Sequence, residues 1–349
     1  MFTRRTLSKL LAALPLAPAT ALSQGRPPLS RIAFGSCANQ SMAQPIWEAI
    51  LAYRPDLFIF AGDNVYGDFS TPDGENLKRA YDAARTIPGY ARLRETVSHL
   101  AIWDDHDYGL NDGGVEFTHK ARSKELFLEF WNVPAADVRR QREGLYEARI
   151  IGPEGMRVQV ILLDVRWFRS PLRITDQRGA PGKERYLPDP DPSKTMLGPE
   201  QWAWLAEELR RPAEIRLIVS STQVLAEGHG WERWGNFPLE KQKLVDTIRT
   251  SGAKGVVLLS GDRHVGALYR ETPADLFPLY EATSSGLNMV YWAAKEAGPN
   301  RLGALYAAAN FGVVEIDWWQ RRLLLALRDE GGSVRRSVEI PFDTLGIAT

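Results

Sequence analysis

Residues 56–66 read Asp-Leu-Phe-Ile-Phe-Ala-Gly-Asp-Asn-Val-Tyr, an uninterrupted apolar run that ends in a short polar turn. A continuous apolar run of this length is typical of a strand buried on both faces, and Gly62 marks a turn at its end. A similar run precedes it at residues 31–34, and residues 42–53 between the two carry apolar side chains at helical spacing. A strand, a helix and a second strand in this order predict a βαβ unit with parallel strands.

The rest of the chain continues this alternation. Further buried strands are predicted at residues 100–103, 158–164, 215–219 and 256–259, and helices at 198–210 and 239–251. Residues 312–341 alternate apolar and polar side chains, as short antiparallel strands do. Stretches richer in glycine, proline and charge are interpreted as loops or small helical insertions over a cleft, at residues 67–90, 108–120 and 170–197. The pattern therefore predicts an α/β protein with mixed sheets and antiparallel C-terminal strands.

Four polar motifs each follow directly after one of these predicted strands. They are Gly35-Ser36-Cys37, Gly62-Asp63-Asn64-Val65-Tyr66, Asp104-Asp105-His106-Asp107 and Gly261-Asp262-Arg263-His264. Sites in α/β sheets form beyond the carboxyl ends of the strands, so side chains that leave several strand ends meet at one rim. We therefore expect the four motifs to form a single site.

The residue types in these motifs suit metal binding. A carboxylate such as that of Asp63 can bridge two cations, and a phenolate such as that of Tyr66 can bind a hard trivalent ion. The ionisable side chains at residues 104–107 repel one another unless cations or arginines neutralise them. Asp262 and His264 stand at i and i+2, on the same side of an extended segment. The alternatives are a turn capped by Asp63, an exposed acidic loop at residues 104–107, and a helix cap followed by a chance histidine.

The chain contains a single cysteine, Cys37. It cannot form a disulfide within the chain, so it is an inert buried thiol, a metal ligand or a nucleophile. Its place after the first predicted strand, facing the same rim as the acidic motifs, favours the ligand.

The formal charges balance, with 43 Lys and Arg against 43 Asp and Glu. No overall field therefore draws the protein to nucleic acid or to an anionic membrane. An anionic substrate must be attracted locally, by metals or by a few arginines.

The first residues are typical of a targeting segment. Arg4 and Arg5 precede an apolar stretch rich in Leu and Ala, which resembles a twin-arginine export signal. An ordinary secretory signal is the alternative, and a membrane anchor is disfavoured because the run is short and contains two prolines. We therefore predict a signal peptide at residues 1–23, recognised by the twin-arginine export machinery, and a catalytic domain at residues 24–349. The mature enzyme would be periplasmic or secreted, without a stable membrane anchor.

Together the motifs resemble the PhoD-like branch, also called alkaline phosphatase D, of the calcineurin-like metallophosphoesterase superfamily. The superfamily shows D-x-H, G-D-x-x-D, G-N-H-E/D, a lone histidine and G-H-x-H in this order, and the four motifs occupy the first, second, third and last places with the substitutions of that branch. Supporting segments are Leu163-Asp164-Val165-Arg166, Leu197-Gly198-Pro199-Glu200-Gln201-Trp202 and Ser220-Ser221-Thr222-Gln223. The resemblance runs from about residue 31 to about residue 286. It implies a four-layer metallophosphoesterase-like β-sandwich flanked by helices.

The resemblance also implies a set of metal ligands. Cys37 and Tyr66 would hold one metal through thiolate and phenolate, and Asp63 would bridge two metals. Asp105 would bind the second metal. The two histidines of the last motif are replaced by Asp262 and His264, and the place of the lone histidine leaves Gln223 as a candidate ligand.

The remaining assignments concern catalysis and metal identity. His106 would donate a proton to the leaving group or clamp the phosphate. Arg166 and Arg263 would neutralise charge in the transition state, with structural salt bridges as the alternative. Thiolate and phenolate favour Fe(III), and the carboxylate-rich second site suits Ca²⁺, with Mn²⁺, Mg²⁺ or Zn²⁺ also considered.

These assignments predict an exported metal-dependent phosphoric ester hydrolase that uses a water activated by two metals. Its substrate would be a small phosphate ester, either a monoester or a diester. The alternatives are a phospholipase D-type phosphodiesterase of the same fold, a hydrolase of nucleic acid, and a non-catalytic exported protein that binds metal or phosphate. Neutral net charge and the lack of a basic and aromatic stripe argue against nucleic acid.

Overall fold

The computed structural model describes residues 27–348, so the predicted signal peptide at residues 1–23 lies outside the described residues. Within residues 27–348, no helix combines the length and the hydropathy needed to cross a bilayer.

The first sheet has six strands in the order β14-β13-β12-β1-β2-β3. The strands are β1 (Arg31–Gly35), β2 (Leu57–Ala61), β3 (His99–Ile102), β12 (Asn310–Asp317), β13 (Arg322–Asp329) and β14 (Val334–Pro341). β1, β2 and β3 are parallel, and the three C-terminal strands pair antiparallel with one another and with β1. Helix α1 (Ile46–Tyr53) connects β1 to β2. The predicted βαβ unit and the antiparallel C-terminal strands are both present.

The second sheet also has six strands, in the order β10-β11-β9-β8-β5-β4. The strands are β4 (Glu147–Ile151), β5 (Val158–Leu163), β8 (Ile215–Ser220), β9 (Val256–Ser260), β10 (Gly266–Glu271) and β11 (Leu279–Ser284). The four central strands are parallel, and β4 and β10 pair antiparallel at the two edges. A short ribbon, β6 (Arg173–Ile174) with β7 (Tyr186–Leu187), stands apart from both sheets.

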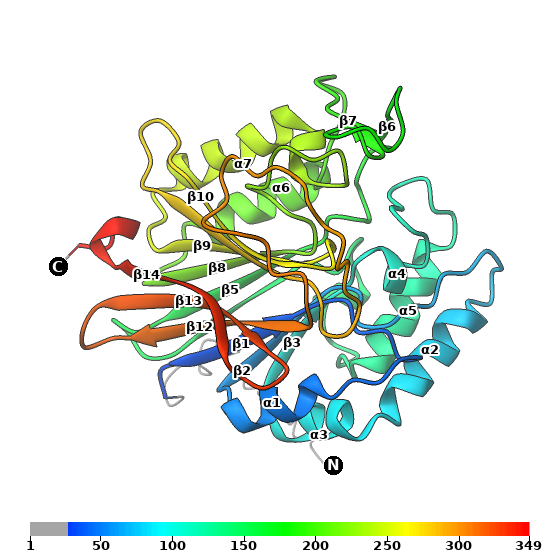
Figure 1. Ribbon diagram of the computed structural model, residues 1–349, viewed down its shortest axis with the longest axis horizontal. Helices are drawn as coiled ribbons and strands as arrows, with labels where there is room; N and C mark the ends of the chain where they lie inside the picture. The colour runs from blue at the N-terminus through cyan, green and yellow to red at the C-terminus, as the bar shows by residue number, and fades with distance from the viewer. Residues whose placement is uncertain (1–26, 349) are drawn as a thin grey trace, which may run out of the picture.

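The two sheets pack face to face and helices cover their outer faces (Figure 1). The first sheet carries α1, α2 (Glu75–Arg85), α3 (Pro88–Thr96) and α5 (Lys120–Phe130), and the second carries α6 (Gly198–Glu208) and α7 (Pro238–Ser251). Trp47 of α1 packs on Phe58 and Phe60 of β2, with ring centroids 5.9 and 6.1 Å apart. The order of layers is therefore helices, sheet, sheet, helices, as the sequence predicts.

The central strands are apolar on both faces because both faces are covered. One set of side chains packs between the sheets, including Val160, Leu217 and Leu259 of the second sheet with Val313 and Leu325 of the first. The alternate set packs under α6 and α7, including Ile161, Ile218 and Leu258 with Leu205 and Ile248. Side chains alternate with a period of two along a strand, so an uninterrupted apolar run fills both cores at once.

Residues 67–90, expected to form loops or small helical insertions, contain the helix α2 and the start of α3, and α5 follows residues 108–120. The strands β4, β10 and β11 are absent from the sequence-based prediction. The third predicted strand ends at Ile102, so Trp103 belongs to the turn that leaves β3.

Candidate metal centre

The ends of the parallel strands meet at one rim, where the two sheets join. Ser36 follows β1 and forms a bridge with Ser285 after β11, and its backbone N–H donates to the Ser284 carbonyl at 3.1 Å. Gly261 follows β9 so closely against Ser36 that a Cβ on this glycine would collide with the Ser36 hydroxyl. This contact brings the strand ends of both sheets together.

The backbone adopts an unusual conformation at three of the strand ends that carry predicted ligands, those after β1, β2 and β9. Four of these residues adopt positive φ: Cys37 (64°), Asp63 (47°), Asp262 (67°) and His264 (57°). Non-glycine residues in this region cost about 1–3 kcal/mol each and persist where the surrounding structure holds them, commonly at functional sites. These four residues, in three turns on one rim, carry candidate ligands at a cost in backbone energy.

The first group of side chains combines sulfur, phenol, carboxyl and imidazole. The Cys37 thiol lies 3.5 Å from Asp63 Oδ2, and the Tyr66 hydroxyl lies 3.2 Å from the same oxygen. The Tyr66 hydroxyl also lies 3.0 Å from His264 Nε2. Cys37, Asp63 and His264 each offer a ligand atom within 4.8 Å of the others, so these residues could hold a metal ion.

The second group consists of carboxylates with one histidine. Asp63, Asp105 and His106 form one set of mutually close ligand atoms, and Asp104, Asp105 and Asp262 form another. Asp105 therefore belongs to two sets. The Asp104 Oδ2 atom is buried and has no hydrogen-bond partner among the described residues.

The acidic side chains of the centre are buried, or half-buried in the case of Asp262, which disfavours their charged forms. Burial, reinforced by the charges of neighbouring carboxylates, raises the pKa of Asp63 and that of Asp262 well above their usual range. Burial also raises the pKa of the Cys37 thiol to about 12. For Asp105, burial acts in the same direction, but the positive charges of Arg166 and the neighbouring imidazole outweigh it and lower the pKa.

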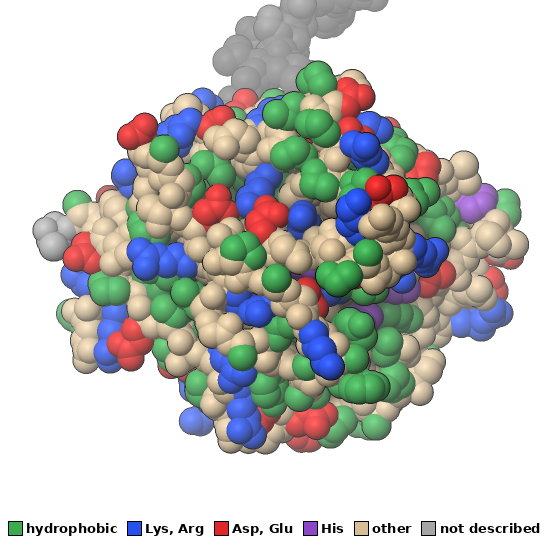
Figure 2. Space-filling view, turned by 45° about the horizontal axis from the view of Figure 1, so that its top comes forward, with side chains coloured by type: hydrophobic (Ala, Val, Ile, Leu, Met, Phe, Trp, Pro, Cys, Tyr) green, Lys and Arg blue, Asp and Glu red, His purple; other side chains and the backbone are tan. Residues whose placement is uncertain are grey.

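His106 lies at the edge of this carboxylate cluster. Its Nδ1 atom lies 2.6 Å from Asp68 Oδ2, and its ring packs on that of Tyr66 with centroids 4.3 Å apart. Burial lowers the pKa of His106, but the charges of Asp105 and Asp63 and the hydrogen bond to Asp68 outweigh it and raise the pKa to about 10. Figure 2 shows histidine side chains recessed between basic and hydrophobic ones on one face of the molecule.

Arg166 is fully buried behind the carboxylates. Its guanidinium contacts Asp104 Oδ1 at 2.5 Å and Glu232 Oε2 at 2.7 Å, and it lies 3.9 Å from Asp105 Oδ1. Arg169 binds the other oxygen of Glu232 at 3.1 Å. Arg166 thus neutralises part of the acidic motif at residues 104–107, and Arg169 pairs with Glu232 beside it. Neutralisation by arginine is one of the two ways in which the charges of that motif can coexist.

Arg263 is also engaged in an ion pair. It binds Glu296 at 2.8 Å, and its guanidinium stands over the Trp231 ring, 5.0 Å from the centroid. Arg166 and Arg263 therefore both form the salt bridges that were considered as their alternative role.

Gln223 is not brought together with the carboxylates. Its Nε2 donates to Tyr269 at 3.1 Å and to Thr283 at 2.9 Å, and its Oε1 lies 3.1 Å from His229 Nε2. Burial and the nearby positive charge of Arg263 lower the pKa of His229 well below its usual range. With every polar atom of its amide engaged, Gln223 fits a structural role better than the ligand role expected from the sequence.

Several residues of the centre were not singled out from the sequence. Asp104 was part of a quoted motif but was not assigned as a ligand, and Ser285 donates or accepts a hydrogen bond with Cys37 at 3.1 Å. Asp68 and Glu232 lie in loops without a repeating pattern, so only the fold reveals their contacts. Asp107 does not point into the centre: it accepts from Asn64 Nδ2 at 2.6 Å and caps the four-residue helix α4 (Asp105–Tyr108).

The donor set fits bound cations. Buried and half-buried carboxylates converge, and within residues 27–348 neither Asp63 nor Asp262 forms an ion pair and Asp104 Oδ2 has no hydrogen-bond partner. Strained turns maintain this arrangement. Buried charges are normally paired or bound to a metal, so cations account for a cluster that is otherwise unfavourable.

Fold and site define a class of protein: an α/β sandwich that gathers candidate metal ligands at its strand ends. The chain belongs to the PhoD-like phosphatase family, whose family model matches residues 32–292. The resemblance drawn from the motifs is thereby confirmed, and family membership supports phosphoesterase activity.

Individual relatives agree with this family. Alkaline phosphatase D of Bacillus subtilis (strain 168) is 22% identical over 194 residues, which cover 47% of this chain but only 30% of that protein. A structure of PhoD matches with a TM-score of 0.69 at 15% identity, covering 92% of this chain and 71% of that chain. GAP50, described as the anchor in the inner membrane complex of Plasmodium, matches with a TM-score of 0.58 at 12% identity, covering 90% of this chain and 89% of that chain. At these identities the structural matches show a shared fold.

Proposed function

We propose that this chain is an exported, metal-dependent phosphoric ester hydrolase of the alkaline phosphatase D type, acting on monoesters, diesters or both. The observation that carries the proposal is the convergence of Asp63, Asp105 and Asp262 beside His106 at one rim of the fold. Export is supported by the sequence alone, through Arg4 and the residues that follow it.

Two metal sites are assigned by donor chemistry. Cys37, Tyr66 and His264 offer thiolate, phenol and imidazole, and we assign Fe(III) to this side of Asp63. Asp105 and the carboxylates beside it offer oxygen ligands, which suit Ca²⁺, with Mn²⁺, Mg²⁺ or Zn²⁺ as alternatives. When bound, two cations supply positive charge for the phosphoryl oxygens and lower the pKa of a water for in-line attack.

The protein's own residues orient the reaction around these sites. The bond from His106 Nδ1 to Asp68 fixes the imidazole and leaves Nε2 as the nitrogen that donates a proton to the leaving oxygen. Arg166 is committed to Asp104 and Glu232, so we assign it the role of holding Asp104 in place. Arg263 is engaged in an ion pair with Glu296, so we assign it a structural role at the rim.

The test begins with the purified mature chain, its metal content, and assays on p-nitrophenyl phosphate and bis-p-nitrophenyl phosphate. His106→Ala should lower kcat by about 10²- to 10⁴-fold with the metal content unchanged, because it removes the proton donor. His119→Ala is the matched control, since the only hydrogen bond of the His119 side chain within the described residues is to the Ser70 carbonyl, at 3.2 Å. A fully metal-loaded protein that hydrolyses neither ester would refute the proposal.

The assignment of Fe(III) is tested separately, by visible absorption spectroscopy. Fe(III) bound to thiolate or phenolate should give a visible charge-transfer band that is lost in Cys37→Ser or Tyr66→Phe. An active, colourless enzyme that contains only Ca²⁺ or Zn²⁺ would refute the iron assignment and leave the hydrolase proposal intact.

A further inference from the structure

A pocket beside the metal centre is lined by two aromatic rings and by small residues. Its volume is 490 Å³, and the rings are those of Trp231 and Tyr291. They meet nearly at a right angle, with an interplanar angle of 74° and centroids 6.1 Å apart. We call this pair of rings the aromatic corner. Most of the remaining wall is made of glycine, alanine and proline: Gly179, Pro181, Gly182, Gly228, Ala293 and Ala297.

Three contacts tie the aromatic corner to the metal centre. The Tyr291 backbone N–H donates to the His264 carbonyl at 2.8 Å. Arg263, which lies between the candidate ligands Asp262 and His264, stands over the Trp231 ring at 5.0 Å. Glu232, the neighbour of Trp231, binds Arg166 behind the carboxylates. These contacts place the aromatic corner beside the candidate metal centre.

A fourth contact comes from the loop that connects β6 to β7, which contains Arg185. Arg185 stands over the Trp231 ring at 5.1 Å and binds Asp112 at 2.6 Å. The Asp112 backbone N–H in turn donates to Asp105 Oδ2 at 2.7 Å. Arg185 thus contacts both the Trp231 ring of the aromatic corner and Asp112, which is hydrogen-bonded to the candidate ligand Asp105.

The charged groups of the pocket wall are mostly occupied elsewhere. Glu296 pairs with Arg263, and Glu184 accepts from the Gly182 backbone N–H at 3.1 Å and from the Gly230 backbone N–H. Lys295 forms no ion pair with any other residue between 27 and 348. The pocket therefore offers flat aromatic and small apolar surface with little demand for hydrogen bonds from its occupant.

We propose that the aromatic corner is the subsite for the leaving group and that it selects phosphate esters whose leaving group carries a planar aromatic ring. The inference rests on the proposed hydrolase function. Aromatic rings prefer edge-to-face or offset contacts, and two rings set at 74° offer both kinds of contact to a third ring between them. The surrounding glycines and alanines leave a flat space that a planar ring fills better than a branched or puckered group.

The experiment compares benzyl and cyclohexylmethyl esters of phosphate, as monoesters and as methyl diesters. The two leaving groups are alcohols of similar size and similar acidity, so they differ mainly in the aromatic ring. The wild-type enzyme should prefer the benzyl ester over the cyclohexylmethyl ester by about 3- to 10-fold in kcat/KM. In Trp231→Ala and in Tyr291→Ala, the ratio of the two kcat/KM values should fall towards one. Tyr291 is the second variant because it is partly exposed and its replacement leaves the Arg263 ion pair in place.

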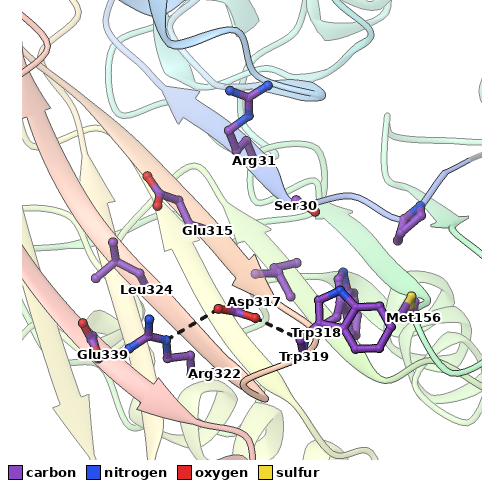
Figure 3. A pocket seen from close by; sticks show the side chains of 12 residues that line it. Ser30, Arg31, Met156, Glu315, Asp317, Trp318, Trp319, Arg322, Leu324 and Glu339 are labelled. Atoms are coloured by element: carbon purple, nitrogen blue, oxygen red, sulfur yellow. Dashed lines mark hydrogen bonds and ion pairs between the residues drawn. The ribbon is translucent and has the colours of Figure 1, made fainter.

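Trp319→Ala is the matched control, because Trp319 is 88% exposed and lies far from the centre. It lines a larger pocket of 580 Å³ with Ser30 and Arg31, at the opposite end of β1 from Cys37 (Figure 3). Equal loss on both esters in the two variants, or a wild-type enzyme without preference, would overturn the inference while leaving the hydrolase intact. Hydrolysis of the p-nitrophenyl esters without hydrolysis of the benzyl esters would overturn the inference alone, whereas failure on all of these esters would overturn the proposed function and the inference together.

Discussion

His106 and Asp68 form the pair on which proton transfer depends. The Nδ1 to Oδ2 distance is 2.6 Å, and the histidine side chain is 19% exposed against 42% for the aspartate. The carboxylate fixes the imidazole ring and stabilises its positive charge, as an ionised acceptor does more strongly than a neutral one.

Asp68→Asn should therefore impair turnover more than binding. The amide still accepts a hydrogen bond but carries no charge, so we expect kcat to fall about 10-fold while KM changes less than twofold. Steady-state kinetics on the better p-nitrophenyl ester measures both constants. Asp73→Asn, an exposed aspartate five residues along the same loop, should leave both unchanged. A rise in KM without a fall in kcat would assign Asp68 to substrate binding instead.

At the scale of single residues, the sequence predicts ligands only where a strand ends. The position of Cys37, Asp63, Asp105 and Asp262 at one rim was predictable because each follows an apolar run that has few alternatives to a buried strand. Gln223 also follows such a strand, but its side chain points to Tyr269 and Thr283. The direction of a side chain after a turn depends on backbone angles that the sequence pattern does not reveal.

At the scale of elements, the uninterrupted apolar strands were predicted, whereas β4, β10 and β11 of the second sheet were not. β11 contains Glu281, a buried carboxylate that accepts from Ser260 at 2.5 Å and from the Val224 backbone N–H at 2.9 Å. A glutamate in that position breaks the apolar pattern, although the fold supplies its hydrogen bonds. β10 and β11 are therefore recognisable as strands only once β9 is in place beside them.

The quoted segments around Asp164 and Gln201 also gain a physical explanation at this scale. Gln201 donates from Nε2 to the Asp164 carbonyl at 2.8 Å and accepts from the Asp164 backbone N–H at 2.9 Å. Asp164 in turn accepts from Trp103 Nε1 at 2.9 Å and from the Arg166 backbone N–H at 3.0 Å. Helix α6 thereby fixes the turn after β5 and, through it, the arginine behind the metal centre.

Gln201→Leu should destabilise the whole fold. It leaves the buried backbone N–H and carbonyl of Asp164 without partners, and each unsatisfied group costs about 1–3 kcal/mol. We expect the free energy of unfolding to fall by about 2–4 kcal/mol, measured by urea denaturation. Gln242→Leu on the exposed face of α7 is the matched control and should change stability by less than about 0.5 kcal/mol. A loss below about 1 kcal/mol for Gln201→Leu would show that the turn after β5 is held by other contacts.

At the scale of the whole molecule, the metal centre lies on the seam between the two sheets. Cys37 and Asp63 follow strands of the first sheet, Asp262 follows a strand of the second, and the Ser36–Ser285 bridge joins them. Ligands contributed by both sheets bind only when the sheets are packed, so metal binding and folding are thermodynamically linked.

Removing the metals should therefore lower the thermal stability of the protein. A ligand present at 1,000 times its Kd stabilises the folded state by about 4 kcal/mol, so chelation should lower Tm by about 5 °C or more. Differential scanning calorimetry before and after dialysis against a chelator measures this shift. An unchanged Tm after verified loss of the metals would contradict the proposed buried centre.

Asp262→Asn separates metal linkage from a general weakening of the fold. In the metal-free protein, Asp262 adds a third, half-buried carboxyl beside the buried Asp104 and Asp105, and desolvation with their charges raises its pKa. The amide relieves that repulsion, so the metal-free variant should melt above the metal-free wild type. The metal-loaded variant should melt below the loaded wild type, because the variant lacks a ligand. The difference in Tm between the metal-loaded and the metal-free protein should therefore be smaller in Asp262→Asn than in the wild type. Asp275→Asn, an exposed aspartate that also has positive φ, at 56° compared with 67°, controls for the backbone and should leave this difference at its wild-type size.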